Sequence, residues 1–125
     1  MLVIWQVAEL LREHVEKIIQ NDRASRDFDF CDQIGRASSS VSDAIAEGFG
    51  RYSHGDMARF FAIALSSRNE VEGQLWRGLQ NGYLTKEQWT VGMRLIKRHT
   101  RAMSRFMQHL RTTDAPPPFD DEAES

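Results

Sequence analysis

The sequence contains very little cysteine and no long hydrophobic run. Cys31 is the only cysteine among 125 residues, which excludes an internal disulfide and predicts a reducing, cytoplasmic location. No apolar run approaches the ~18 residues that a membrane-spanning helix needs. The opening residues 1–6 also lack the basic region and the small-residue cleavage site of a signal peptide. We therefore expect neither secretion nor membrane insertion.

The side-chain groupings typical of enzymes and metal sites are also missing. A di-iron bundle needs Glu-x-x-His motifs, and the chain has none. Residues 38–40 are three serines inside a predicted helix, not on the strained turn that exposes a nucleophile. Cys31 is interpreted as a small core residue, and His99 as a hydrogen-bonded core or interface histidine. The four histidines share no ligand spacing: His14, His54, His99 and His109. We predict no catalytic residue, no metal and no cofactor.

Charge and proline are distributed unevenly along the chain. The formal net charge is −2, but five acids and no Lys or Arg lie in residues 114–125, so residues 1–113 hold 16 bases against 13 acids. All three prolines, residues 116–118, lie in the same acidic segment and cannot continue a helix. The sequence therefore predicts one domain over residues 1–113 and a disordered acidic tail over residues 114–125.

Four segments show apolar residues at helical spacing, and none shows the alternation of a strand. The second helix is expected over about residues 28–47 and the fourth over residues 86–112. Short connections favour antiparallel neighbours, so the predicted fold is an all-α, up-down-up-down four-helix bundle. The apolar positions are Ile4, Ala8, Leu11, Val15 and Ile18; Phe30, Ile34, Ala37, Val41 and Ile45; Met57, Phe61, Ala64, Val71, Leu75 and Leu79; and Trp89, Met93, Ile96, Met103, Met107 and Leu110.

Polar residues at the predicted helix ends support these boundaries. The segment from residue 20 to residue 27 is polar and is expected to be a loop. Ser53 with Asp56, and Thr85 with Gln88, have the spacing of a capping box. Gly48 and Gly50 are expected to end the second helix in a left-handed turn. The glycine-rich residues 48–55 also include Arg51 and precede a helix, so two interpretations stay open: an anion cradle or a plain turn.

The fourth helix has a strongly basic composition. Residues 88–113 contain six Lys or Arg residues, two histidines and no acid. Its arginines recur at intervals of 4, 3 and 4 residues, which places them on one ridge opposite the apolar positions. Such a ridge indicates either contact with nucleic-acid phosphates or a solvated face. The candidate residues, here called the basic row, are Arg94, Lys97, Arg98, Arg101 and Arg105.

The second helix is rich in small and hydroxyl residues, which permit close approach of another helix. Its polar residues Gln33, Arg36, Ser40 and Glu47 lie on one flank. They indicate either an oligomer interface or pairing within the helix, such as Glu47 with Arg51.

Arg68 interrupts the apolar positions of the third helix. We expect it to be partly buried and paired with a carboxylate, with Glu47 and Glu70 as the first candidates, unless its stem reaches solvent.

Several motifs resemble a known family of four-helix bundles encoded in ribosomal RNA intervening sequences. They include Gln33-Ile34-Gly35-Arg36-Ala37, Ser40-Val41, Ile45-Ala46-Glu47-Gly48 and Gly50-Arg51, followed by Phe60-Phe61-Ala62-Ile63-Ala64 and Gly82-Tyr83-Leu84. Gly35, Ser42, Ala44 and Arg68 depart from the usual pattern. The resemblance spans about residues 4–112 and implies a homo-oligomer, usually a pentamer. A related bundle is an accessory of a reverse transcriptase and binds nucleic acid.

Two functions follow as hypotheses. The first is a non-catalytic homo-oligomer that binds structured RNA, or a nucleic-acid enzyme similar to a reverse transcriptase, through the basic row. The alternative is a scaffold that binds protein only. An enzyme is disfavoured because the chain offers no cluster of acid, base or metal ligand.

Overall fold

The computed structural model describes residues 3–51 and 53–112 and contains the four predicted helices. They are α1 (Val3–Ile19), α2 (Phe28–Phe49), α3 (His54–Gln80) and α4 (Lys86–Thr112). A short 3₁₀ turn, η1 (Ala24–Arg26), interrupts the predicted loop between α1 and α2. No strand occurs in these two ranges, which confirms the all-α prediction. The predicted tail, residues 114–125, lies outside the described residues.

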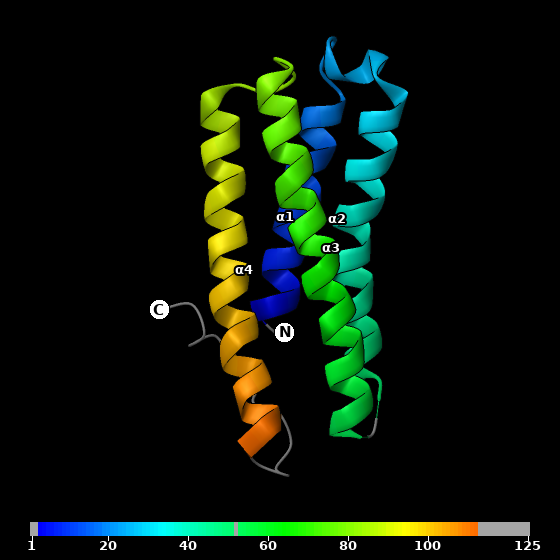
Figure 1. Cartoon of the computed structure of the whole chain (residues 1–125), viewed down its shortest axis with the longest axis vertical. Helices are drawn as coiled ribbons and strands as arrows, with labels where there is room; N and C mark the ends of the chain where they lie inside the picture. The colour runs from blue at the N-terminus through cyan, green and yellow to red at the C-terminus, as the bar shows by residue number, and fades with distance from the viewer. Residues whose placement is uncertain (1–2, 52, 113–125) are drawn as a thin grey trace.

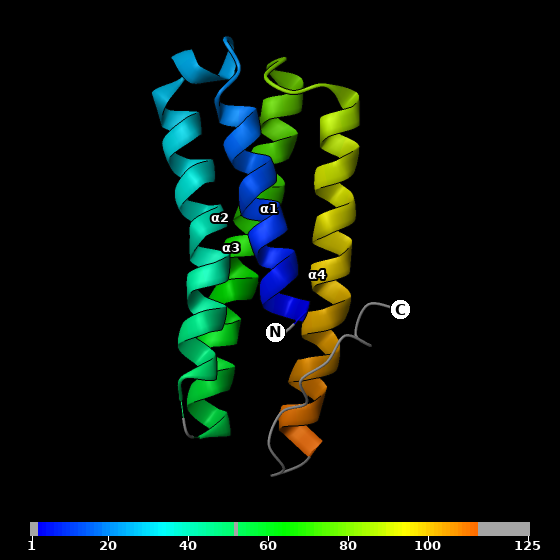
Figure 2. The ribbon, with the colours of Figure 1, turned by 180° about the vertical axis from the view of Figure 1, so that it is seen from behind.

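The helices form an antiparallel bundle in which each helix runs opposite to the next (Figure 1). Helices α1 and α3 each contact both α2 and α4. The four helices therefore close around one core, as the up-down-up-down prediction requires. Figure 2 shows that α1 is short and that its N-terminal end lies part-way along α4. The end of the bundle beyond that point is built from α2, α3 and α4.

The core consists of the apolar face of each helix. Ile4, Leu11, Ile34, Phe61 and Leu75 are all almost fully buried. Where α1 no longer covers the bundle, three phenylalanines from three helices fill the space. Phe49, Phe61 and Phe106 pack edge to face, with ring centroids 5.1–5.2 Å apart. This geometry is the favourable arrangement for aromatic rings and joins α2, α3 and α4.

Local hydrogen bonds define the starts of three helices. The Ser53 hydroxyl accepts from the Asp56 backbone N–H at 3.1 Å, as predicted. The capping box at α4 is complete: Gln88 N–H donates to Thr85 Oγ1 at 3.0 Å, and Thr85 N–H donates to Gln88 Oε1 at 2.8 Å. At α2, Asp27 Oδ1 accepts from the Phe30 N–H at 3.0 Å. These bonds satisfy backbone donors that have no partner within the helix.

The glycines at the end of α2 differ from the prediction. Gly50 has φ −84°, and Gly82 is the only residue with positive φ in the described ranges. The left-handed turn predicted at Gly48 and Gly50 is therefore wrong. Gly48 is required for packing instead, because a Cβ there would lie 2.7 Å from Phe61 Cε1. The left-handed glycine is Gly82, in the turn between α3 and α4.

Candidate functional site

The basic row lies on the side of α4 that faces away from the core. Arg94, Lys97, Arg101 and Arg105 are exposed, and Arg98 is half-buried. The opposite side of the helix is buried through Ile96, His99, Met103, Phe106 and Leu110. This geometry follows from the 3.6-residue period, because arginines at intervals of 4, 3 and 4 residues stay on one face. The one acid of α4 is Glu87, in its first turn, and no acid occurs between residue 88 and residue 112.

Arginines on the other helices, apart from Arg68, differ because carboxylates lie beside them. Arg12 pairs with Glu9 and Glu16 at 2.7 and 2.8 Å, and Arg77 lies 3.5 Å from Asp29. Arg36, Arg51 and Arg59 each pair with an acid three or four residues away. Within residues 3–51 and 53–112, no ion pair involves Arg94, Lys97 or Arg101. These three cations therefore form a positive surface that no described carboxylate neutralises.

The polar flank of α2 contacts α3 of the same chain. Gln74 Nε2 donates to Gln33 Oε1 at 2.8 Å, and the Ser40 and Ser67 hydroxyl oxygens lie 2.7 Å apart. Gln33, Arg36 and Ser40 share a small cavity of about 290 Å³ with Ser67 and Glu70. Arg36 forms an ion pair with Asp32 on α2, and Glu47 forms one with Arg51, just beyond the end of α2. The structure thus brings Gln33, Arg36 and Ser40 together, and their role in an oligomer stays a prediction.

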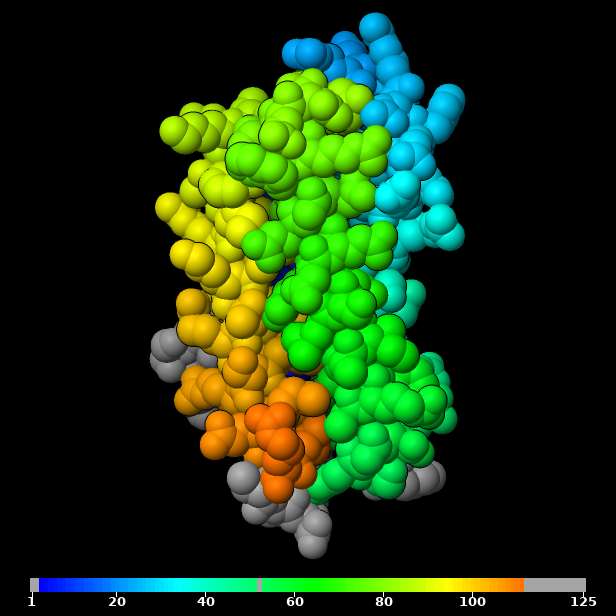
Figure 3. Space-filling view, viewed as in Figure 1, coloured from blue at the N-terminus to red at the C-terminus, as the bar shows by residue number. Residues whose placement is uncertain are grey.

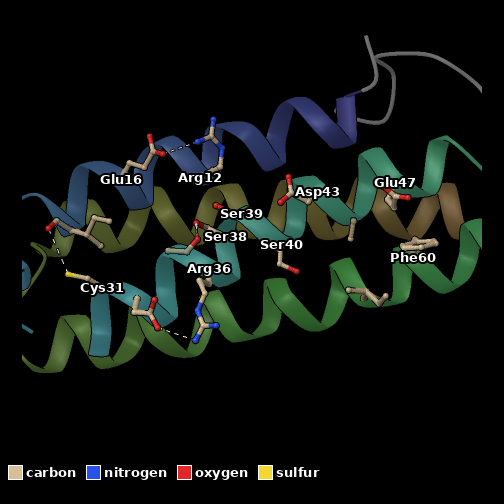
Figure 4. A pocket seen from close by; sticks show the side chains of 15 residues that line it. Arg12, Glu16, Cys31, Arg36, Ser38, Ser39, Ser40, Asp43, Glu47 and Phe60 are labelled. Atoms are coloured by element: carbon tan, nitrogen blue, oxygen red, sulfur yellow. Dashed lines mark hydrogen bonds and ion pairs between the residues drawn. The ribbon is translucent and has the colours of Figure 1, made fainter. Parts of the chain in front are cut away.

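An open groove of about 730 Å³ runs along α2 between α1 and α3. Figure 4 shows Ser39 and Asp43 of α2 along it, with Arg12 and Glu16 of α1 on one side and Phe60 of α3 on the other. Small side chains of α2 line its middle, among them Gly35 and Ser39. At Gly35, nothing lies within 4 Å of an added Cβ. This surface is therefore open to a partner, and the sequence prediction of close helix approach on α2 is consistent with it.

The glycine-rich connection after α2 forms a turn that engages its own arginine. Arg51 Nη2 lies 2.6 Å from Glu47 Oε2, and the Arg51 guanidinium lies 4.5 Å from the centre of the Phe60 ring. The guanidinium is thus bound on two sides by groups of the same chain. The geometry favours the interpretation of a plain turn over an anion cradle.

The model of one protein family, the 23S rRNA-intervening sequence proteins, matches residues 1–105. The chain belongs to this family. The match includes α1, α2, α3 and the part of α4 that carries the basic row. The resemblance inferred from the motifs in α2 is therefore confirmed. No curated protein matches the chain.

Arg68, one of the departures from the family pattern, is a cation in the core face of α3. Its Nη2 donates to Asn69 Oδ1 at 3.1 Å, while the buried Nε and Nη1 have no hydrogen-bond partner among the described residues. Burial lowers the pKa of Arg68, and the charge of Glu72 partly offsets this effect. The predicted pairing with Glu47 or Glu70 is wrong, because Glu47 binds Arg51 and Glu70 lines the cavity beside α2.

His99 is fully buried in α4, near enough to Arg68 to be affected by its charge. Neither ring nitrogen has a hydrogen-bond partner in the described part of the chain, so the prediction of a hydrogen-bonded histidine is wrong. Burial, followed by repulsion from Arg68, lowers the pKa of His99 from 6.5 to about 3. The imidazole is therefore neutral at pH 7.

The described residues contain no group of three or more His, Cys, Asp or Glu side chains placed to hold a metal ion. Cys31 donates from its thiol to the Ala24 carbonyl at 3.1 Å, and burial raises the pKa of this thiol. A raised pKa disfavours the reactive thiolate.

None of the helices in the described ranges is long and apolar enough to span a membrane.

Sequence reasoning missed one surface feature, an aromatic pair on α3 and α4. Trp76 is 53% exposed, and its ring packs against Trp89 with centroids 6.4 Å apart. Trp89 was assigned to the core face of α4, but it is only half-buried. Trp76 falls outside the apolar positions of α3, next to Leu75. This position in the sequence indicates that the Trp76 ring lies at the surface.

Proposed function

We propose that this chain is a non-catalytic homo-oligomer that binds the phosphate backbone of structured RNA through the basic row of α4. The observation that carries the proposal is the absence of any described ion pair at Arg94, Lys97 and Arg101. Unopposed cations at helical spacing attract phosphates by releasing counterions, with little dependence on base sequence. A row repeated in each subunit of an oligomer adds avidity.

A salt series with a structured RNA tests this proposal. The variant Arg94→Gln/Lys97→Gln/Arg101→Gln should raise Kd at least tenfold at low salt. The slope of log Kd against the logarithm of the salt concentration should also fall by about 2, because up to three phosphate contacts are lost. Fluorescence anisotropy with a labelled RNA hairpin measures both quantities.

The matched control removes the same charge elsewhere. Lys17, Arg26 and Arg59 are exposed on other elements and lie outside the candidate interface, so Lys17→Gln/Arg26→Gln/Arg59→Gln has the same net charge. This control should bind RNA like the wild type. If both triple variants lose affinity equally, binding depends on net charge alone and the basic row is a solvated face.

The acidic segment supplies a second, independent arm of the experiment. Residues 114–125 carry five acids and follow the basic helix directly in the sequence. A polyanion near the row competes with phosphates, so deleting residues 115–125 should tighten RNA binding. Unchanged affinity after deletion would show that the segment does not compete.

The homo-oligomer, a pentamer by resemblance to the family, is supported by the open groove on α2. Ser40 is an unsuitable probe of an interface, because its hydroxyl already contacts Ser67. Gly35 is better, since nothing lies within 4 Å of an added Cβ, and we expect a large side chain there to leave the fold intact. Gly35→Trp should dissociate the assembly in light scattering while the helical circular dichroism persists. A monomeric wild type would contradict the proposal of an oligomer.

The same groove favours a second candidate function, a scaffold that binds protein only. An oligomeric wild type that shows no RNA binding at low salt would establish this alternative over the first.

A further inference from the structure

The aromatic pair Trp76 and Trp89 joins α3 to α4. These two helices form most of the face that is toward the viewer in Figure 3. The two rings meet edge to face, with an interplanar angle of 61° and centroids 6.4 Å apart. Trp89 thus supports the Trp76 ring from one side, while 53% of Trp76 is exposed to solvent. An indole ring that is held in place and still accessible can stack against another flat ring.

Trp89 precedes the basic row on the same helix, α4. Trp89, Met93, Lys97 and Arg101 follow one another at intervals of four residues, so they lie along one gently inclined row of α4. At 1.5 Å per residue, Lys97 is about 12 Å and Arg101 about 18 Å from Trp89 along the helix axis. The aromatic platform therefore stands at one end of the unpaired cations, within reach of one short stretch of nucleic acid.

We propose that Trp76 stacks on an unpaired base of an RNA whose backbone phosphates contact Lys97 and Arg101. This inference rests on the proposed function and specifies its substrate as RNA with single-stranded nucleotides. The base faces of a continuous duplex are covered by neighbouring bases, whereas loops, bulges and ends expose them. An aromatic platform beside cations is the arrangement that recognises single strands without sequence preference. The cations Lys97 and Arg101 farther along α4 favour this ligand over an apolar protein surface, while the exposed Glu72 lies one turn from Trp76 on α3.

The experiment compares two probes, a 20-nucleotide single-stranded RNA and a blunt duplex of the same length. Trp76→Leu should weaken binding of the single strand roughly 5- to 100-fold and leave duplex binding unchanged. Its salt dependence should match that of the wild type, because no charge is removed. Trp76→Phe should restore most of the affinity, since a phenyl ring also stacks. Phe28→Leu, a change at an 84% exposed aromatic on α2, is the matched control and should bind normally.

Fluorescence adds a direct readout. The single strand should quench tryptophan emission in the wild type and much less in Trp76→Leu, although Trp5 and Trp89 remain. Equal affinity of the wild type and Trp76→Leu for the single strand overturns the inference. Dissociation of the oligomer by Trp76→Leu, with RNA binding intact, also overturns it and assigns the pair to a protein contact.

These outcomes separate the inference from the proposed function. If the Arg94/Lys97/Arg101 variant loses affinity for both probes and Trp76→Leu loses none, the basic row binds RNA and the stacking site is refuted. If the wild type binds neither probe at low salt, the proposed function and the inference both fail.

Discussion

The contact between α2 and α3 differs from the contact between α3 and α4 in how well its polar groups are matched. Across α2–α3, Gln33 bonds Gln74 and Ser40 bonds Ser67. On the α3–α4 side, buried nitrogens of Arg68, His99 and Trp89 have no hydrogen-bond partner among the described residues, whereas α2 and its C-terminal turn have two such atoms, Ser42 Oγ and Arg51 Nε. Buried polar groups normally find partners, because an unmatched one loses its hydration without compensation. We infer that α2–α3 provides rigidity, whereas the α3–α4 side carries a cost in stability that substitutions can remove.

The largest change in stability that tests this comparison is expected at His99. This change depends on pH. The pKa of His99 is about 3 in the folded protein, below its ordinary value of 6.5, so the unfolded chain binds the proton more readily. The stabilising effect of the neutral ring is fully present above pH 6.5 and is lost as the pH falls toward 3. The maximum loss is roughly 5 kcal/mol, from 1.36 kcal/mol per unit of pKa.

Urea denaturation of the wild type and of His99→Leu between pH 7 and pH 4 measures this effect. His99→Leu should lose less stability over this range, because it has no imidazole to protonate. Carboxylates titrate equally in both proteins and cancel in the difference. His54→Gln, which replaces a less buried histidine, should follow the wild type. Parallel pH profiles for the wild type and His99→Leu would show that His99 is hydrated in the folded state.

The next effect tests the close packing of α2 on α3. Gly48→Ala places a Cβ 2.7 Å from the Phe61 ring, which is fixed among Phe49 and Phe106. Overpacking of this kind costs about 1–3 kcal/mol, more than an alanine gains in a helix. Gly35→Ala on the same helix meets nothing within 4 Å and should gain roughly 0.5–1 kcal/mol. Chemical denaturation of both variants gives the difference. Equal stability of the two would mean that α2 and α3 separate easily.

The smallest effect is expected at Arg68. Arg68→Leu removes two buried donors that lack partners and places an apolar side chain in an apolar face of α3. The gain in the free energy of unfolding should be about 1–2 kcal/mol, the cost commonly assigned to unmatched buried polar groups. Thermal denaturation at pH 7 measures it, and light scattering checks the assembly. A loss of stability or of assembly would show that Arg68 finds its partner in another subunit.

The sequence alone was sufficient for features that depend on neighbours within one or two turns. The apolar spacing predicted α4 over its observed residues, and Thr85 with Gln88 predicted its cap, because helix geometry links residues three and four apart. The same periodicity placed the basic row on one face. For the candidate site the sequence was sufficient only to that extent, since it did not show that Arg94, Lys97 and Arg101 make no ion pair among the described residues.

Tertiary structure decided the features that depend on two helices at once. Gly48 had been assigned to a left-handed turn, but contact with Phe61 of α3 explains it. Arg68 had been assigned a carboxylate partner, and its actual surroundings depend on how α3 and α4 pack. Trp76 became recognisable as a surface platform only when Trp89 was placed against it. The periodicity of one helix determines which residues share a face, but only packing determines what that face meets.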